Sequence, residues 1–422
     1  MNYSISLNKL YIFYVIFFAV IIDAIYGALA LVGLEGLKIS ALYRAVLIFG
    51  FMVLLLKRSD IFSNWMRVII ILWLMSMLNL AISNKMPFPF LDIQIFFKVM
   101  FPFAVYYFLL FSLKNENLAM LSCRGISFFG AIAGLLFLFS IITGIGHQNY
   151  GVGRFGISSF FPAGNDIGIA LILSLCFSWY LFLTTASNKY IVAVILTTLA
   201  LLLSGTRAGI MGAGLVNIIF VIVFLSRRYP NIYTSRNMTF KKIIFIILFA
   251  IIMFQVTTFI VDNIDVFAFQ LEKLIEVSKA LNPRENSIEH GIKYLKIRPL
   301  FETLYGSGVY FQVESAKSFS HAFGVNTERA SFEQDTLDIF GYYGLILGGG
   351  ILLLHYYFLV NAIGNFFMRP NLLLFTISIA LGLLLVVGNL SGHGITSPQV
   401  GTIVGTIYYI LMRKSDENIN YK

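Results

Sequence analysis

The chain consists of long apolar runs separated by short polar segments. Most runs are about 20 residues long, enough for a helix to cross the roughly 30 Å hydrocarbon layer of a bilayer. The runs are continuous rather than alternating, which favours helices over the strands of a membrane barrel. We therefore predict an all-α polytopic membrane protein with about 12 transmembrane helices. The predicted spans are residues 10–31, 39–56, 66–82, 95–113, 126–145, 166–186, 189–204, 208–225, 243–261, 336–364, 371–389 and 398–412.

The composition supports this fold class. Hydrophobic residues make up 59% of the 422 residues, and charged residues make up 12%. A soluble domain has about 45–50% apolar and about 25% charged residues, so the apolar excess is too large for one buried core. The two cysteines, Cys123 and Cys176, lie in a predicted inner loop and in a predicted span, and no disulfide framework is expected.

Lysine and arginine fall mainly on one side of the predicted topology. With the N-terminus inside, the inner segments contain sixteen of these residues, and the short outer loops and helix ends contain six. Basic residues accumulate in cytoplasmic loops, so both termini are predicted in the cytoplasm. Topology therefore explains the formal charge of +10, and no nucleic acid partner is expected.

One polar segment, residues 262–335, is much longer than the others. It holds eleven of the 20 acidic residues, and it contains stretches with apolar residues at helical spacing. Loops of this length are uncommon unless they are functional. We therefore divide the chain into spans 1–9 (residues 1–261), a large outer loop with amphipathic helices (262–335), and spans 10–12 with a cytoplasmic tail (336–422).

Four cationic side chains near the outer ends of spans are candidates for binding an anion. Arg207 lies in the short turn Ser204–Gly209, where glycines and a helix start favour anions and the guanidinium offers a bidentate fork. Arg154 lies in a Gly- and Pro-rich outer loop, Arg284 opens a predicted amphipathic helix, and Lys98 lies near the outer end of the fourth span. The structural alternatives are interfacial side chains reaching for water, an ordinary loop, and a solvated helix face.

Acidic residues mark the point where the large loop re-enters the membrane. Glu333 and Asp335 lie at the mouth of the tenth span, where a carboxylate is a candidate general base. The structural alternative is a charge that complements the helix N-terminus. A divalent metal held with Asp338 is a further alternative, but no His cluster or calcium-loop spacing supports it, and no metal is expected. The histidines share no metal-ligand spacing, and His393 in the last outer loop, SGHGITS, is the one kept as a candidate.

Three stretches carry arginine motifs in a fixed order. They are GRFGISSFFPAGNDIG (Gly153–Gly168), LLLSGTRAGIMGAGL (Leu201–Leu215), and Arg284 followed by a predicted helix and RPLFETLYGSG. They resemble, with looser spacing and an insertion, three motifs of the bacterial O-antigen polymerase and O-antigen ligase superfamily. These motifs are an Arg…Gly-x-x-x-Asn-x-x-x-Gly loop, a Ser-x-Ser/Thr-Arg-Gly/Ala stretch, and an arginine before a Pro-Leu-x-Gly-x-Gly turn. The resemblance extends to the topology, with its large periplasmic loop late in the chain.

A fourth match departs from the ligase pattern. Ligases of the superfamily carry His-Asn/Ser/Gln, nine residues, Gly, two residues, and Gly/Thr/Tyr. Counting back from Gly344 places Glu333 on the histidine and Gln334 on the next position, while Leu347 replaces the last one. The ligase histidine is absent and a carboxylate stands in its place, so the resemblance favours a polymerase.

The resemblance implies a glycosyltransferase of the bacterial inner membrane that uses no metal and no cofactor. It would polymerise undecaprenyl-diphosphate-linked oligosaccharide repeat units into O-antigen or capsule at the periplasmic face. Its expected partners are the bilayer, the lipid-linked oligosaccharides, a chain-length regulator and a flippase. The alternatives are an O-antigen ligase, a lipid-linked oligosaccharide flippase or other transporter, and a non-catalytic scaffold. The expected site comprises a base, Glu333; diphosphate-binding residues Arg207, Arg284 and Arg154; and secondary candidates Lys98, Asp335 and His393.

Overall fold

The structure is a computed structural model that describes residues 13–112, 118–149, 156–185, 187–226, 288–323 and 334–419. The chain forms two compact units, each assembled from three separate stretches of sequence. The first unit comprises Met1–Ile39, Leu118–Val277 and Asn365–Ala380, and the second comprises Ser40–Asn117, Ser278–Gly364 and Leu381–Lys422.

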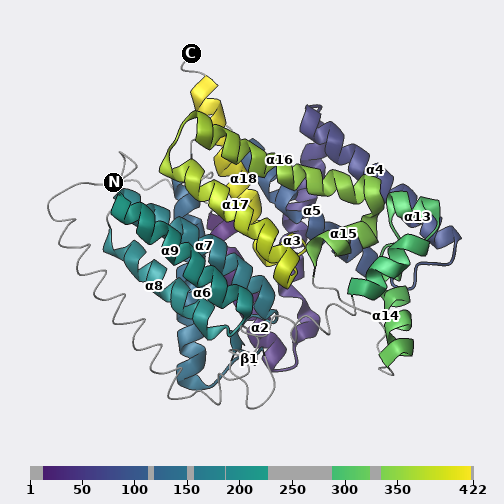
Figure 1. The fold of residues 1–422 in the computed structure, drawn as a ribbon, viewed down its shortest axis with the longest axis horizontal. Helices are drawn as coiled ribbons and strands as arrows, with labels where there is room; N and C mark the ends of the chain where they lie inside the picture. The colour runs from purple at the N-terminus through teal and green to yellow at the C-terminus, as the bar shows by residue number, and fades with distance from the viewer. Residues whose placement is uncertain are drawn as a thin grey trace. The chain divides into compact units, whose positions relative to one another are not determined.

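In the first unit, apolar helices pack around a central one (Figure 1). The central helix α7 (Gly164–Thr185) has nearly all its side chains buried, and it packs against α6 (Ala119–Thr143), α8 (Asn188–Leu203) and α9 (Arg207–Ser226). Gly130 of α6 allows this approach, because a Cβ there would lie 2.7 Å from the Thr197 hydroxyl of α8. The other elements are η1 (Phe13–Phe17), α2 (Phe18–Leu31), η2 (Glu35–Leu37) and the antiparallel strands β1 (His147–Gln148) and β2 (Ile157–Ser159).

In the second unit, α5 (Pro89–Ser112) packs against α18 (Pro398–Ile419), where Gly401 and Gly405 lie against Pro102. Helix α17 (Leu372–Ser391) begins in the first unit and ends in the second. Residues 288–297 are also helical. The remaining elements are α3 (Ile39–Lys57), α4 (Ile61–Ile82), α13 (Leu300–Tyr305), α14 (Tyr310–Phe323), α15 (Asp335–Tyr343), η3 (Gly344–Gly348) and α16 (Gly349–Met368).

The described helices confirm the predicted all-α polytopic membrane fold. Among them, eight are long and apolar enough to cross a membrane, and Val15–Leu31 and Asn188–Leu203 are shorter apolar helices. The last predicted span, residues 398–412, lies within α18, and the ninth, residues 243–261, lies outside the described residues. The tenth predicted span is divided into α15, η3 and α16, because Gly344 takes a left-handed φ of 67°.

Contacts inside each unit join segments that are predicted to lie on the same side of the membrane. Among outer segments, the Ile395 N–H donates to Asp335 at 2.7 Å in the second unit, and His147 lies 2.9 Å from the Gly27 carbonyl in the first. Among inner segments, the Tyr107 hydroxyl donates to Asp60 at 2.8 Å. These contacts agree with the multi-pass topology, while the side that faces the cytoplasm stays a prediction from the charge distribution.

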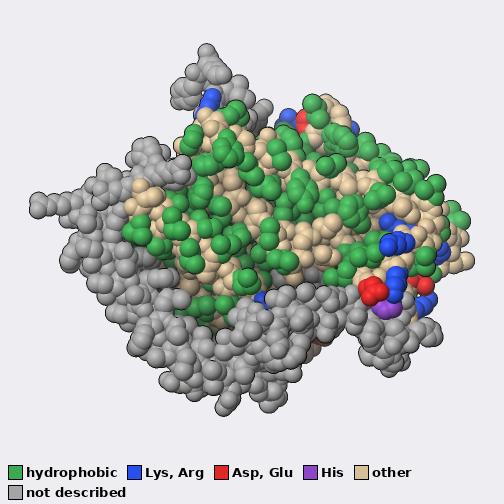
Figure 2. Space-filling model, in the orientation of Figure 1, with side chains coloured by type: hydrophobic (Ala, Val, Ile, Leu, Met, Phe, Trp, Pro, Cys, Tyr) green, Lys and Arg blue, Asp and Glu red, His purple; other side chains and the backbone are tan. Residues whose placement is uncertain are grey.

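Hydrophobic side chains cover much of the described surface in view, as helices that face lipid require (Figure 2). Charged side chains gather instead near α13 and α14 (Figure 2). Helical residues 288–297 contribute the Lys293–Glu289 ion pair, at 2.8 Å on an exposed face. Their apolar side chains Tyr294 and Leu295 pack on a buried cluster that includes Phe311. The segment is therefore the amphipathic helix that its spacing predicts.

Candidate active site

Arg207 is the first residue of α9, in the tight turn that the sequence predicts. Gly205 enters the turn with a left-handed φ of 62°, and the Gly209 N–H donates to the Thr206 hydroxyl at 3.1 Å. Ser204 and Thr206 are buried, and a Cβ at Gly209 would lie 2.5 Å from the Ser204 hydroxyl oxygen. Glycines in this motif therefore give the turn its compactness, and Arg207 stands at the positive end of a helix dipole.

The hairpin that carries Arg154 is anchored to the same turn in the first unit. Asn149 follows β1, and its side-chain amide donates to the Ser204 carbonyl at 2.7 Å and to the Ile157 carbonyl of β2 at 3.0 Å. Gly164 at the start of α7 packs directly against the Asn149 side chain. Arg154 lies outside the described residues, two positions before Gly156. The structure thus brings together the ends of its loop and the Arg207 turn.

In the second unit, the turn Gly306–Gly308 docks on the C-terminal end of α15. The Ser307 N–H donates to the Gly341 carbonyl at 3.1 Å, and the Gly308 N–H donates to the Tyr342 carbonyl at 3.0 Å. A Cβ at Gly306 would overlap the Tyr342 carbonyl, and one at Gly344 would overlap the Gly306 backbone. The glycines of two separate motifs are therefore required by one backbone-to-backbone contact.

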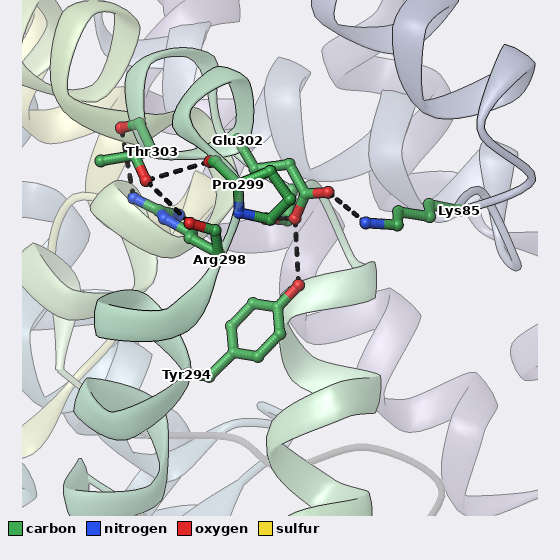
Figure 3. Close-up of polar contacts among 7 residues, drawn as sticks. Lys85, Tyr294, Arg298, Pro299, Glu302 and Thr303 are labelled. Atoms are coloured by element: carbon green, nitrogen blue, oxygen red, sulfur yellow. Dashed lines mark hydrogen bonds and ion pairs between the residues drawn. The ribbon is translucent and has the colours of Figure 1, made fainter.

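Glu302 holds this turn through a buried polar cluster (Figure 3). Glu302 is 3% exposed, accepts hydrogen bonds from the Tyr294 hydroxyl at 3.1 Å and the Ser307 hydroxyl at 3.0 Å, and forms an ion pair with Lys85. Burial and the neighbouring Glu302 charge raise the pKa of Tyr294 above its usual range, so its hydroxyl stays a donor. Glu302 therefore ties the large loop to the segment after α4.

Two further groups fix the same region. Arg298 donates to the Phe340 carbonyl at 3.2 Å and to the Thr303 carbonyl at 3.3 Å, which agrees with a structural rather than an anion-binding role. Burial lowers the pKa of Arg298, although Tyr294 and Glu302 raise it in part. On α5, Asp92 accepts from the Val309 N–H at 2.6 Å, directly after the glycine turn.

Asp335 lies at the start of α15 and is fully buried, at 0% exposure. Its Oδ2 accepts from the Ile395 N–H at 2.7 Å, and its Oδ1 accepts from the Thr396 hydroxyl at 3.1 Å. Gly388 and Gly394 make room for the carboxylate, since a Cβ at Gly394 would lie 2.9 Å from Oδ2. These contacts give Asp335 a structural role in binding the loop between α17 and α18 to the start of α15.

His393 belongs to that loop, within the second unit. Its Nδ1 lies 3.3 Å from the Thr396 hydroxyl oxygen, so Asp335, Thr396 and His393 form a continuous polar chain. The side chain is half-buried, and the backbone has a left-handed φ of 62°. Such a conformation is uncommon for a residue other than glycine.

The other predicted site residues have different outcomes. Glu333 and Arg284, like Arg154, lie outside the described residues, so their roles stay predictions. Lys98 lies on α5 and is half-buried. No group of three His, Cys, Asp or Glu side chains suited to a metal occurs among the residues that the structure describes. Because Glu333 falls outside them, the alternative of a metal held by the three carboxylates is not tested.

Thr396, Glu302 and Asp92 are not identified by the sequence as parts of this region. For Thr396, the sequence does carry a signal. The nearby glycines Gly388, Gly392 and Gly394 indicate a loop whose backbone another side chain can approach closely. Glu302 and Asp92 give no such signal, because their partners lie 217 positions away in the chain.

Residues 192–354 match the family model of the O-antigen ligase family. The matched region contains Arg207, Arg284, Glu333 and Asp335, and it ends before His393. No curated protein gave a match. The family match confirms the resemblance seen in the motifs, and it does not distinguish a polymerase from a ligase. The chain is thus a multi-spanning membrane protein whose residues 192–354 are similar to the O-antigen ligase family.

Proposed function

We propose that the protein polymerises undecaprenyl-diphosphate-linked oligosaccharide repeat units into O-antigen or capsule at the periplasmic face of the inner membrane. The observation that carries the proposal is the carboxylate of Glu333 at the position of the ligase histidine. Glu333 lies inside the region that matches the family, 11 positions before Gly344. The backbone of Gly306 lies so close to Gly344 that a Cβ would not fit there, which explains the glycine at position 344 of the motif.

The reaction joins two repeat units and releases a lipid diphosphate. A hydroxyl oxygen of the acceptor unit attacks the anomeric carbon of the donor, and the bond from that carbon to the diphosphate oxygen breaks. Glu333 takes the proton of the acceptor hydroxyl, a contribution of about 10²–10⁴-fold for a positioned base. Arg207, Arg284 and Arg154 neutralise the diphosphate, since guanidinium forks bind phosphate oxygens in pairs.

The proposal includes a place for the chain in the cell. Residues 262–335 form the periplasmic loop between spans 9 and 10, and both termini lie in the cytoplasm, as the distribution of basic residues predicts. Repeat units assembled on lipid must reach the periplasmic face before polymerisation, which requires a flippase. A separate chain-length regulator is the remaining expected partner.

Deletion of the gene, followed by a gel of surface glycans, tests the proposal. For a polymerase, the ladder collapses to products with one repeat unit, and the wild-type gene restores it. An O-antigen ligase is the second candidate, because the matching family carries that description. Its deletion removes all repeat units from the surface and leaves polymer on the lipid carrier. Polymerisation by the purified protein excludes a flippase and a scaffold.

A further inference from the structure

The polar chain Asp335–Thr396–His393 determines which nitrogen of His393 carries the proton. An ionised carboxylate accepts hydrogen bonds and donates none, so the Thr396 hydroxyl donates its only hydrogen to Asp335 Oδ1. The ionised form is supported by the 2.7 Å hydrogen bond from the Ile395 N–H and by the position of Asp335 at a helix N-terminus. The Thr396 oxygen is then an acceptor toward His393 Nδ1, 3.3 Å away.

His393 Nδ1 therefore carries the hydrogen, and Nε2 of the neutral ring carries the lone pair. A carboxylate or hydroxyl that binds one ring nitrogen in this way sets the tautomer and orientation of the imidazole. Among the described residues, Nδ1 forms a hydrogen bond with the Thr396 hydroxyl oxygen, and Nε2 forms none. The arrangement leaves an oriented proton acceptor on a half-buried side chain.

The backbone around His393 agrees with a fixed position for the ring. Its φ of 62° follows Gly392 at 78°, and Ile395 and Thr396 are both bound to the buried Asp335 carboxylate. The loop is thus anchored two and three positions after His393. Non-glycine residues in left-handed conformations cluster at functional sites, where the surrounding structure maintains them.

We propose that His393 is a second acid–base residue of the glycosyl transfer, with Thr396 and Asp335 as its positioning residues. This inference rests on the proposed function. As the acceptor oxygen bonds to the anomeric carbon and the diphosphate leaves with its electron pair, Glu333 takes the proton of the hydroxyl and passes it to His393 Nε2. The imidazolium returns it to water before the next transfer. The imidazole from the loop before α18 thus restores the Glu333 carboxylate for the next transfer.

The test measures the initial rate of polymerisation of lipid-linked repeat units in membranes from the deletion strain, with each variant at matched abundance. His393→Asn keeps a residue that tolerates left-handed backbone but provides no base, and we expect a rate about 10²–10⁴-fold lower. His393→Gly keeps the backbone and removes the ring, and added imidazole should restore part of its rate. Thr396→Val should lose rate, while Thr396→Ser, which keeps the hydroxyl, should retain it.

The outcomes separate this inference from the proposed function. Full activity of His393→Asn, or failure of imidazole to raise the rate of His393→Gly, overturns the role of His393. Equal rates for Thr396→Val and Thr396→Ser overturn the positioning role of Thr396. If the wild-type membranes themselves make no polymer from repeat units, the proposed function fails instead.

Discussion

The backbone N–H of Gly308 donates a 3.0 Å hydrogen bond to the carbonyl oxygen of Tyr342. This bond joins the glycine turn of the large loop to the end of α15, where the membrane-embedded part of the chain resumes. Because the same contact requires glycine at 306 and at 344, it links two motifs that are far apart in the sequence. The candidate base Glu333 precedes the helix on which this contact is made.

Gly344→Ala should destabilise the protein strongly. The left-handed φ of 67° alone costs an alanine about 1–2 kcal/mol, and its Cβ would overlap the Gly306 backbone. Gly349→Ala is the matched control, because no atom lies within 4 Å of a Cβ there. Thermal unfolding in detergent should show a lower Tm for Gly344→Ala only. Equal Tm values for both variants would contradict the docking contact.

The arginines should be essential for polymerisation. Arg207→Ala and Arg284→Ala each remove a charge-assisted contact to the diphosphate, with an expected loss of about 2–5 kcal/mol in transition-state binding. Lysine at either position should restore activity only in part, since an ammonium lacks the bidentate fork. Polymerisation rates in membranes measure this, with the exposed Arg369→Ala as control. Normal rates for both alanine variants would place the diphosphate elsewhere.

Asp60 lies in a predicted inner segment, and its carboxylate should make the free energy of unfolding depend on pH. Its carboxylate caps α4 by accepting from the Ser63 N–H at 3.0 Å, and it also accepts from the Tyr107 hydroxyl at 2.8 Å. Burial raises the pKa of Asp60, but these hydrogen bonds outweigh burial and hold it below its usual range.

A carboxyl whose pKa is lowered by folding stabilises the protein above the unfolded pKa, about 3.9 for Asp, and loses this contribution as the pH falls through the folded pKa. Asp60→Ala should therefore lower the free energy of unfolding by about 0.5–2 kcal/mol near neutral pH, as expected for a lost cap. In Tm measurements against pH, the difference from wild type should shrink below about pH 4. A difference that stays constant to low pH would exclude the ionised cap.

The hydrophobic pattern predicts the fold well, because span length and continuity follow directly from the thickness of the bilayer. It does not predict the break between α15 and α16, since apolar residues continue through Gly344 and only a distant backbone contact imposes the break. Motif spacing correctly predicts Arg207 at a helix start, because the glycine turn that precedes the helix is a local feature of the sequence.

The polar connections of the candidate site depend on tertiary pairing and are less predictable. Asp335 and His393 are each recognisable as candidates, yet their link through Thr396 spans 61 positions and follows no local rule. Lys85 and Glu302 both look like ordinary solvated charges, and only the fold pairs the half-buried Lys85 with the buried Glu302.

The membrane topology predicts which parts of the chain react from outside. Single cysteines at Ser318 and Ser415, with Cys123 and Cys176 removed, place one probe on the large loop and one near the C-terminus. A membrane-impermeant thiol reagent added to cells with a permeable outer barrier should label the first and not the second. The reverse pattern would invert the topology that the basic residues predict.

Glu333→Gln tests most directly whether the chain is an acid–base polymerase. Glutamine keeps the size and polarity of glutamate but does not accept a proton at neutral pH. In the deletion strain, with membrane abundance equal to wild type, we expect surface glycans that carry single repeat units and no ladder. A normal ladder made by Glu333→Gln would contradict it.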